Sequence, residues 1–113
     1  MDAAYREELD YLKAYAGQDW LGFGPIAGAA AKLLRGRWTQ DAENELMLRL
    51  VADLLAAGVR AGELTSSDET PFEPWPGDAA AVLDRIAREL KARADSPDTG
   101  DICWFTVLQP RSG

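Results

Sequence analysis

The sequence predicts an α+β domain that is mostly helical, with four helices packed against a small two-stranded antiparallel sheet. Three segments place apolar residues at the spacing of three and four that is typical of amphipathic helices, and an alanine-rich segment after Pro25 predicts a fourth helix. Two further stretches, 59–64 and 102–108, are typical of strands, and we expect them to pair with each other. Because a two-stranded sheet is only marginally stable alone, it is expected to lie on the helices.

The first half of the chain is predicted to form two helices joined by an aromatic connector. The first spans 3–16, and Gly17 stands where helices commonly end. The connector, 19–24, is rich in glycine and aromatic residues, and Pro25 suits the first position of a second helix that runs to about 34. The apolar stripe of the first helix consists of Tyr5, Leu9, Leu12 and Ala16.

The third and fourth helices have the clearest boundary signals. Thr39 is a favourable N-cap for the third helix, and Gly58 closes it. Asp78 is the equivalent cap for the fourth, which is expected to span 79 to about 94, before Pro97. The apolar stripes are Leu46, Leu50, Val51, Leu54 and Leu55 in the third helix, and Val82, Leu83, Ile86 and Leu90 in the fourth.

The two predicted strands differ in their expected surroundings. The segment 59–64 alternates only loosely, and a long loop, 65–77, follows it. The segment 102–108 is apolar on both sides of its alternation, so both of its faces are expected to be covered. Cys103 is predicted to be a core residue, and Asp101 to accept backbone hydrogen bonds from the preceding turn.

Composition and charge narrow the classes of function. The length of 113 residues is that of a single domain, 1–113, and the net charge of −7 disfavours direct binding to nucleic acid. The acidic start lacks an apolar signal region, and no apolar run is long enough to span a bilayer. With a single cysteine, which excludes an internal disulfide, these features predict a cytoplasmic protein without a membrane role.

Catalytic chemistry finds little support in the residue types. The absence of histidine excludes Ser-His-Asp and Cys-His arrangements and a histidine metal site. The segment 22–28 lacks the pattern of a phosphate-binding loop, and 95–101 lacks that of a calcium-binding loop. A hydrolase with paired carboxylates is left open, although capping and solvation explain most of the acids. We therefore predict no enzymatic activity, cofactor or metal.

Residues 54–105 carry a series of short motifs: Leu-Leu-Ala-Ala-Gly, Ala-Gly-Glu-Leu, Phe-Glu-Pro-Trp, Asp-Arg-Ile-Ala-Arg-Glu-Leu and Pro-Asp-Thr-Gly-Asp-Ile-Cys-Trp-Phe. The series resembles small uncharacterised bacterial proteins of the actinobacterial type that end in a GDIxWF signature. Leu90 departs from the pattern, where a larger aromatic is expected. The resemblance implies an intracellular protein of the kind found among toxin-immunity partners, and it carries over no activity.

The leading functional hypothesis comes from the loop 65–77. Between Gly62 and Asp78 the chain has acidic residues and no lysine or arginine, and two aromatics are interspersed among them. Carboxylates would steer a basic partner and aromatics would anchor the contact. The sequence thus predicts a protein-binding module, an inhibitor or immunity-type protein that occludes a basic, toxin-like partner. Its predicted contact residues are Asp68, Glu69, Phe72, Glu73 and Trp75.

Three other interpretations stay open at this level. In the first, the two loop aromatics, Phe72 and Trp75, fold back on the core and leave the acids as a solvated face. A small-ligand-binding or catalytic protein would have its pocket near Trp20, Phe23 and Trp38. A structural subunit would dimerise through an exposed aromatic patch. The sequence specifies neither the partner nor the oligomeric state.

Overall fold

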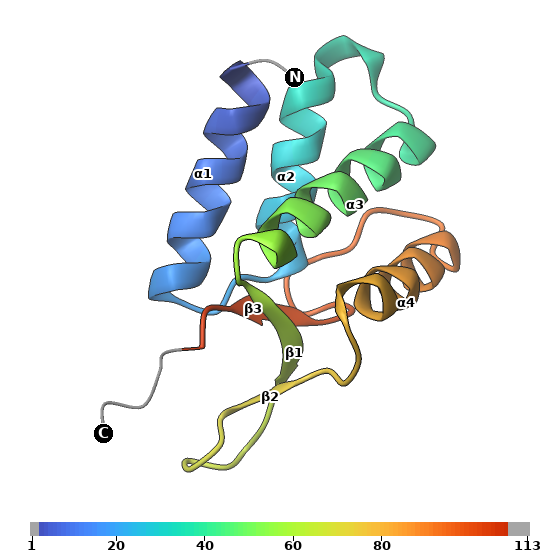
Figure 1. Ribbon diagram of the computed structural model, residues 1–113. Coiled ribbons are helices and arrows are strands. Elements are labelled where there is room, and N and C mark those ends of the chain that lie inside the picture. The colour runs from blue at the N-terminus through green and yellow to red at the C-terminus, as the bar shows by residue number, and fades with distance from the viewer. Residues whose placement is uncertain (1–2, 109–113) are drawn as a thin grey trace.

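The computed structural model describes residues 3–108, which form four α-helices and a three-stranded antiparallel sheet (Figure 1). The helices are α1 (Ala3–Gln18), α2 (Phe23–Leu34), α3 (Gln40–Ala56) and α4 (Ala79–Lys91), and a short 3-10 helix (Arg35–Arg37) follows α2. The strands are β1 (Arg60–Leu64), β2 (Phe72–Pro74) and β3 (Trp104–Thr106). The α+β class is therefore confirmed.

The sheet has three strands, so the prediction of two was wrong. β1 is the central strand in the order β2-β1-β3; Ala61 lies opposite Phe105, as the predicted pairing requires, and Leu64 lies opposite Phe72. β2 lies within the predicted loop and makes a hairpin with β1. It escaped prediction because it has three residues and ends in Pro74, which cannot donate to a ladder and is tolerated only at a sheet edge.

Gly62 allows the two strands of the hairpin to approach closely. A Cβ atom at this position would lie 2.3 Å from the carbonyl oxygen of Glu73 and 2.7 Å from the ring of Phe72. Gly22 in the connector and Gly24 in the first turn of α2 have a similar role, since a Cβ at Gly22 would lie 2.7 Å from the methyl carbon of Thr99 and one at Gly24 would lie 2.2 Å from its hydroxyl. Close packing therefore accounts for the glycine-rich connector, which lies against the turn that precedes β3.

The last strand begins later than predicted because a strained turn precedes it. Ile102 has a φ of 65°, which is unusual for a β-branched residue, and the Cys103 N–H donates to the Asp101 carbonyl at 2.8 Å. The Asp101 carboxylate accepts the Asp98 N–H at 2.9 Å and pairs with Arg93 at 2.8 Å. The expected bonding of Asp101 to the turn backbone is confirmed, and it holds the strained residue in place.

The predicted helix caps are present. The Ala42 N–H donates to the Thr39 hydroxyl at 3.0 Å, and the Ala81 N–H donates to the Asp78 carboxylate at 2.9 Å. Gly58, with a φ of 97°, closes α3 as expected.

Three other boundaries differ from the prediction. α1 continues through Gly17 to Gln18, α2 begins at Phe23 ahead of Pro25, and α4 ends at Lys91. A Cβ at Gly17 would meet open space, so this glycine is tolerated inside the helix at a modest cost in stability. None of the helices in residues 3–108 is long and apolar enough to cross a membrane.

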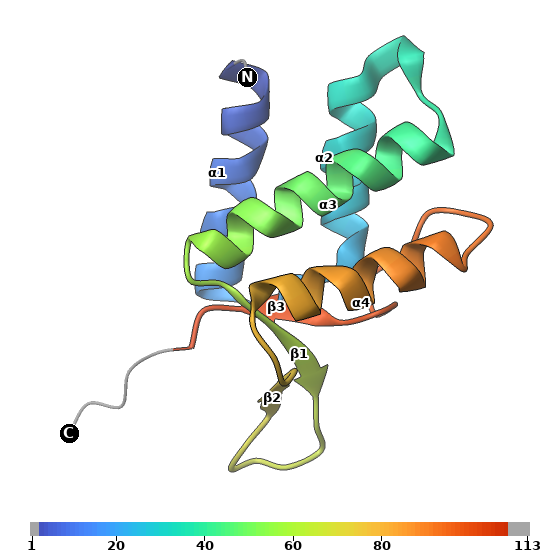
Figure 2. The same cartoon turned by 45° about the vertical axis from the view of Figure 1, so that its right-hand side comes forward.

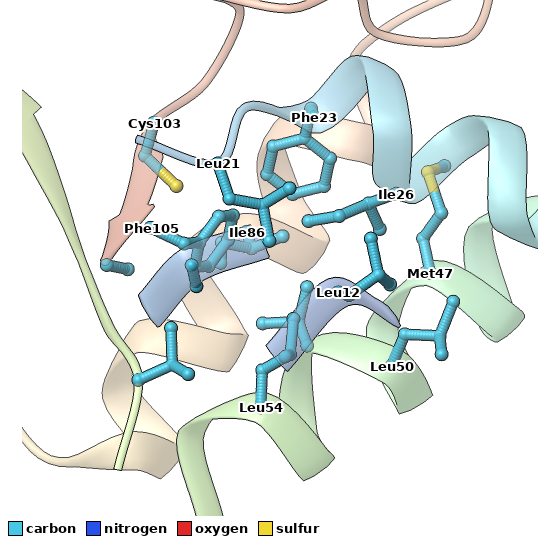
Figure 3. Close-up of a cluster of buried hydrophobic side chains, with 14 of the residues drawn as sticks. Leu12, Leu21, Phe23, Ile26, Met47, Leu50, Leu54, Ile86, Cys103 and Phe105 are labelled. Atoms are coloured by element: carbon cyan, nitrogen blue, oxygen red, sulfur yellow. The ribbon is translucent and has the colours of Figure 1, made fainter. Parts of the chain in front are cut away.

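The core lies between the helices and one face of the sheet (Figure 3). Phe23 and Phe105 meet edge to face with their ring centroids 5.4 Å apart. Cys103 is buried as predicted, and this burial raises the pKa of its thiol. The fully buried side chains around them include Leu12 of α1, Ile26 of α2, Leu50 and Leu54 of α3, and Ile86 of α4.

Candidate functional site

The acidic segment forms the tip of the β1–β2 hairpin, which projects away from the helices (Figures 1 and 2). The tip is ordered by its own hydrogen bonds. The Thr65 N–H donates to the Pro71 carbonyl at 2.8 Å, and the Thr65 hydroxyl donates to the Thr70 carbonyl. The Ser67 hydroxyl accepts the N–H groups of Glu69 and Thr70, each at 3.2 Å. Threonine and serine side chains thus fix the conformation of the turn.

The three carboxylates predicted to meet a partner are exposed on this hairpin. Asp68, Glu69 and Glu73 form no ion pair with any residue in the range 3–108. Glu63 differs, because its carboxylate lies 4.0 Å from the Arg85 guanidinium. The hairpin therefore presents uncompensated negative charge to solvent at its tip and along β2.

The two predicted aromatic anchors are buried, so they do not offer the exposed contact that the sequence suggested. Phe72 is 8% exposed, and its ring stacks on Trp20 with centroids 5.8 Å apart and planes at 7°. Trp75 is 5% exposed under the Arg85 guanidinium, 3.5 Å from the ring centroid, and donates its indole N–H to Glu63 at 3.3 Å. Both rings fasten the hairpin to the rest of the chain, as the fold-back interpretation requires.

The rings of Trp20, Phe23 and Trp38 do not line a common pocket. Phe23 is inside the core against Phe105. Trp38 is half-exposed, and its indole N–H donates to the Glu43 carboxylate. Trp20 stacks on the hairpin instead. Of the three, Trp20 borders a groove.

That groove, of about 560 Å³, lies between the α1–α2 connector, the hairpin and the end of β3. Two carboxylates line it, Asp19 from the connector and Glu69 from the hairpin, and no lysine or arginine is among its described lining residues. Its arrangement suits an apolar group with positive charge nearby. The apolar part of the lining consists of Trp20, Pro71, Phe72, Val107 and Leu108.

A buried carboxylate at Glu43 is a further polar feature, and sequence reasoning missed it. Glu43 is 2% exposed and accepts hydrogen bonds from the Trp38 indole, the Ser96 hydroxyl and, at 3.5 Å, the Gln40 amide. It ties the start of α3 to the segment after α4. Helical spacing was the available signal, because Glu43 shares the buried face of α3 with Met47, Leu50 and Leu54.

Comparisons with protein-family models, with curated proteins and with solved structures gave no match. Within residues 3–108, no group of three or more cysteine, aspartate or glutamate side chains is placed to hold a metal ion.

Proposed function

We propose that this protein is a cytoplasmic protein-binding module of the inhibitor or immunity type, which occludes a basic, toxin-like partner. The observation that carries the proposal is the projecting hairpin, whose exposed charges at Asp68, Glu69 and Glu73 are all negative and form no ion pair with a described residue. Exposed carboxylates raise the rate of encounter with a basic surface. A turn already held by Thr65 and Ser67 loses less conformational entropy on binding.

Phe72 and Trp75 have a positioning role in this proposal. Trp20 holds Phe72 from one side of the hairpin, and Arg85 of α4 holds Trp75 from the other. Because Arg85 is engaged with both Trp75 and Glu63, it is a poor neutralising partner for the acids at the tip. The carboxylates are thus displayed on a supported strand pair, and the partner would meet them before the aromatics.

The strand register supplies a further reason for a basic partner. Glu63 and Glu73 lie directly opposite each other in the β1–β2 pair, and like charges in this position are destabilising. Arg85 offsets the charge of Glu63, whereas Glu73 has no cation among the described residues. A lysine or arginine of the partner beside Glu73 would relieve the remaining repulsion. Inhibition by coverage requires no nucleophile, cofactor or metal.

Charge reversal with a matched control tests the proposal. The hairpin set is Asp68→Lys, Glu69→Lys and Glu73→Lys; the control set, Glu7→Lys, Glu45→Lys and Glu89→Lys, makes the same charge change on exposed helical positions. Immobilised wild type and control set should capture the same basic protein from native-cell extract, and the hairpin set should lose it. With the captured protein, the hairpin set should associate at least about tenfold more slowly at low salt. Equal capture by both sets would refute the proposal.

Occlusion is tested on the captured protein itself. Stoichiometric wild-type protein should abolish its activity, or its toxicity when both are co-expressed, and the hairpin set should not. A captured partner whose activity is unchanged by the wild type would show that the module binds without inhibiting.

A further inference from the structure

The groove beside the hairpin exposes apolar surface to solvent. Trp20 is stacked on Phe72 and remains half-buried, and Leu108, which also lines the groove, is 43% exposed. An apolar side chain inserted between them would remove surface of both from water, which favours binding at about 25 cal/mol per Å² of apolar area. Aromatic platforms of this kind are typical of the centre of protein interfaces.

The electrostatic character of the groove selects what accompanies that side chain. Asp19 and Glu69 approach it from two different elements, and neither has an ion pair with a described residue. The last turn of α1, which contributes Gly17 and Gln18 to the lining, has no basic residue, so no cation of the helix itself offsets the negative end of its dipole. Arg60 of β1 pairs with the lining residue Thr106 in the β1–β3 register, but Arg60 itself is not among the lining residues.

Strand addition is a poor alternative mode of binding here. The edge strand β2 lies between Pro71 and Pro76 and includes Pro74, and prolines at an edge blunt pairing with another chain. The outer side of β3 is already engaged, because Phe105 and Leu21 exchange two backbone hydrogen bonds of 2.8 Å. A partner would therefore dock through its side chains.

We infer that this groove receives one apolar or aromatic side chain from a segment of the partner, with a lysine or arginine on each side pairing with Asp19 and Glu69. The inference rests on the proposed function and specifies the segment that the partner places beside the hairpin. The apolar residue packs between Trp20 and Leu108, and the flanking cations meet the carboxylates at the border of the groove.

Synthetic nonapeptides test the chemistry of the occupant. The probe has a central leucine, phenylalanine or tryptophan between two lysines or arginines, titrated against the full chain by calorimetry. Replacing the central residue by alanine, or the flanking cations by glutamate, should each weaken binding at least tenfold. Equal binding of the glutamate-flanked peptides, or no binding of any peptide at millimolar concentration, would overturn the inference.

Two sets of variants separate this inference from the proposed function. The groove set is Asp19→Asn with Leu108→Arg; the asparagine keeps the side-chain oxygen that accepts the Trp20 N–H at 2.8 Å. The hairpin pair, Asp68→Lys with Glu73→Lys, omits the Glu69 change of the hairpin set and so leaves the groove lining unchanged. We expect the groove set to lose peptide binding at least tenfold and the hairpin pair to retain it. If the hairpin pair alone loses capture of the native partner while the groove set still binds the peptide, the groove inference is overturned and the proposed function stands.

If the groove were instead occupied by the end of this chain or by a second copy, different results would follow. Deletion of residues 109–113, or Arg111→Ala, should leave peptide affinity unchanged; a tenfold gain would assign the groove to the end of this chain and overturn the inference. Sedimentation of the wild type should show no concentration-dependent dimer. A dimer that Leu108→Arg removes would assign the groove to a second copy and overturn the inference.

Discussion

The two faces of the sheet differ in what covers them. On the inner face Ala61 and Phe105 lie opposite each other and are fully buried, together with Cys103, under the helices. On the outer face Leu64 and Phe72 form an equivalent pair, but Trp20 alone stacks on Phe72 and Leu64 stays 37% exposed. The inner face packs into the core and stabilises the fold. The outer face belongs to the hairpin and borders the groove, both of which are proposed for recognition.

The contrast also corrects the expectation for the segment 102–108. Of its inner side chains, Cys103 and Phe105 are buried as predicted, and Val107 is partly buried. Its outer side is covered only in part, since Trp104 is half-buried and Leu108 is exposed. Apolar residues on both sides of this strand therefore correspond to two different surroundings: a core face, and a partly exposed apolar face that borders the groove.

The largest difference between the faces should appear on deleting an inner aromatic. Phe105→Ala removes a fully buried ring and is expected to destabilise the fold by about 3–5 kcal/mol, measured by urea denaturation. Leu108→Ala is the matched outer change and should cost less than about 1 kcal/mol, because that side chain is already partly in water. Similar losses for the two variants would remove the distinction between the faces.

Gly62, where the two strands of the hairpin approach closely, should be the next most sensitive position for stability. Gly62→Ala forces a Cβ against the Glu73 carbonyl and the Phe72 ring, with an expected loss of about 1–3 kcal/mol. Gly28→Ala, where a Cβ meets open space on α2, should instead stabilise by about 0.5–1 kcal/mol. Thermal unfolding of the two variants gives the comparison, and a neutral Gly62→Ala would show that the hairpin is not closely packed.

Burial on the inner face should also make the stability of the fold depend on pH under alkaline conditions. Burial raises the pKa of the Cys103 thiol above its ordinary value near 9, so the folded state resists ionisation that the unfolded chain undergoes. Stability is therefore complete below about pH 9 and falls above it, by about 1.4 kcal/mol per pH unit. Cys103→Ala should remove this slope between pH 9 and 10.

Tyr5 provides the control for that measurement. Burial and the hydrogen bond that its hydroxyl donates to Asp53 raise the pKa of Tyr5 above its ordinary value of 10.0. Tyr5→Phe should therefore flatten the loss of stability only above about pH 10. A slope between pH 9 and 10 that survives in Cys103→Ala would assign it to another group.

The smallest effect is expected at the exposed end of the hairpin. Glu73→Lys replaces a like-charge pair opposite Glu63 by an attractive one and should stabilise by about 0.2–1 kcal/mol. Glu69→Lys, which lies in the turn without a cross-strand partner, should stay within about 0.5 kcal/mol of the wild type. Chemical denaturation at low and high salt measures both, and added salt should diminish the gain.

Local signals in the sequence explain which elements were predictable. Thr39 and Asp78 capped their helices as expected because a cap depends on residues three positions away. β2 was not predictable, since its three residues become a strand only by pairing with β1. The burial of Glu43 depends on Ser96, which is distant in the sequence, so its stripe position alone gave a hint.

The candidate site divides in the same way. Its negative charge is a property of composition, and the exposed positions of Asp68, Glu69 and Glu73 agree with the expectation from the sequence. The places of Phe72 and Trp75 depend on Trp20 and Arg85, whose contacts with them no local pattern encodes. The groove likewise exists only because α1, the hairpin and the end of β3 converge.

The sequence by itself therefore determined the α+β class, the helices and the acidic character of one segment, because periodicity, capping and charge act over a few residues. Only the tertiary structure decided that this segment is a hairpin, that its aromatics are supports and that a groove opens beside it. Those features arise from contacts between residues far apart in the chain, whose formation depends on the packing of the whole domain.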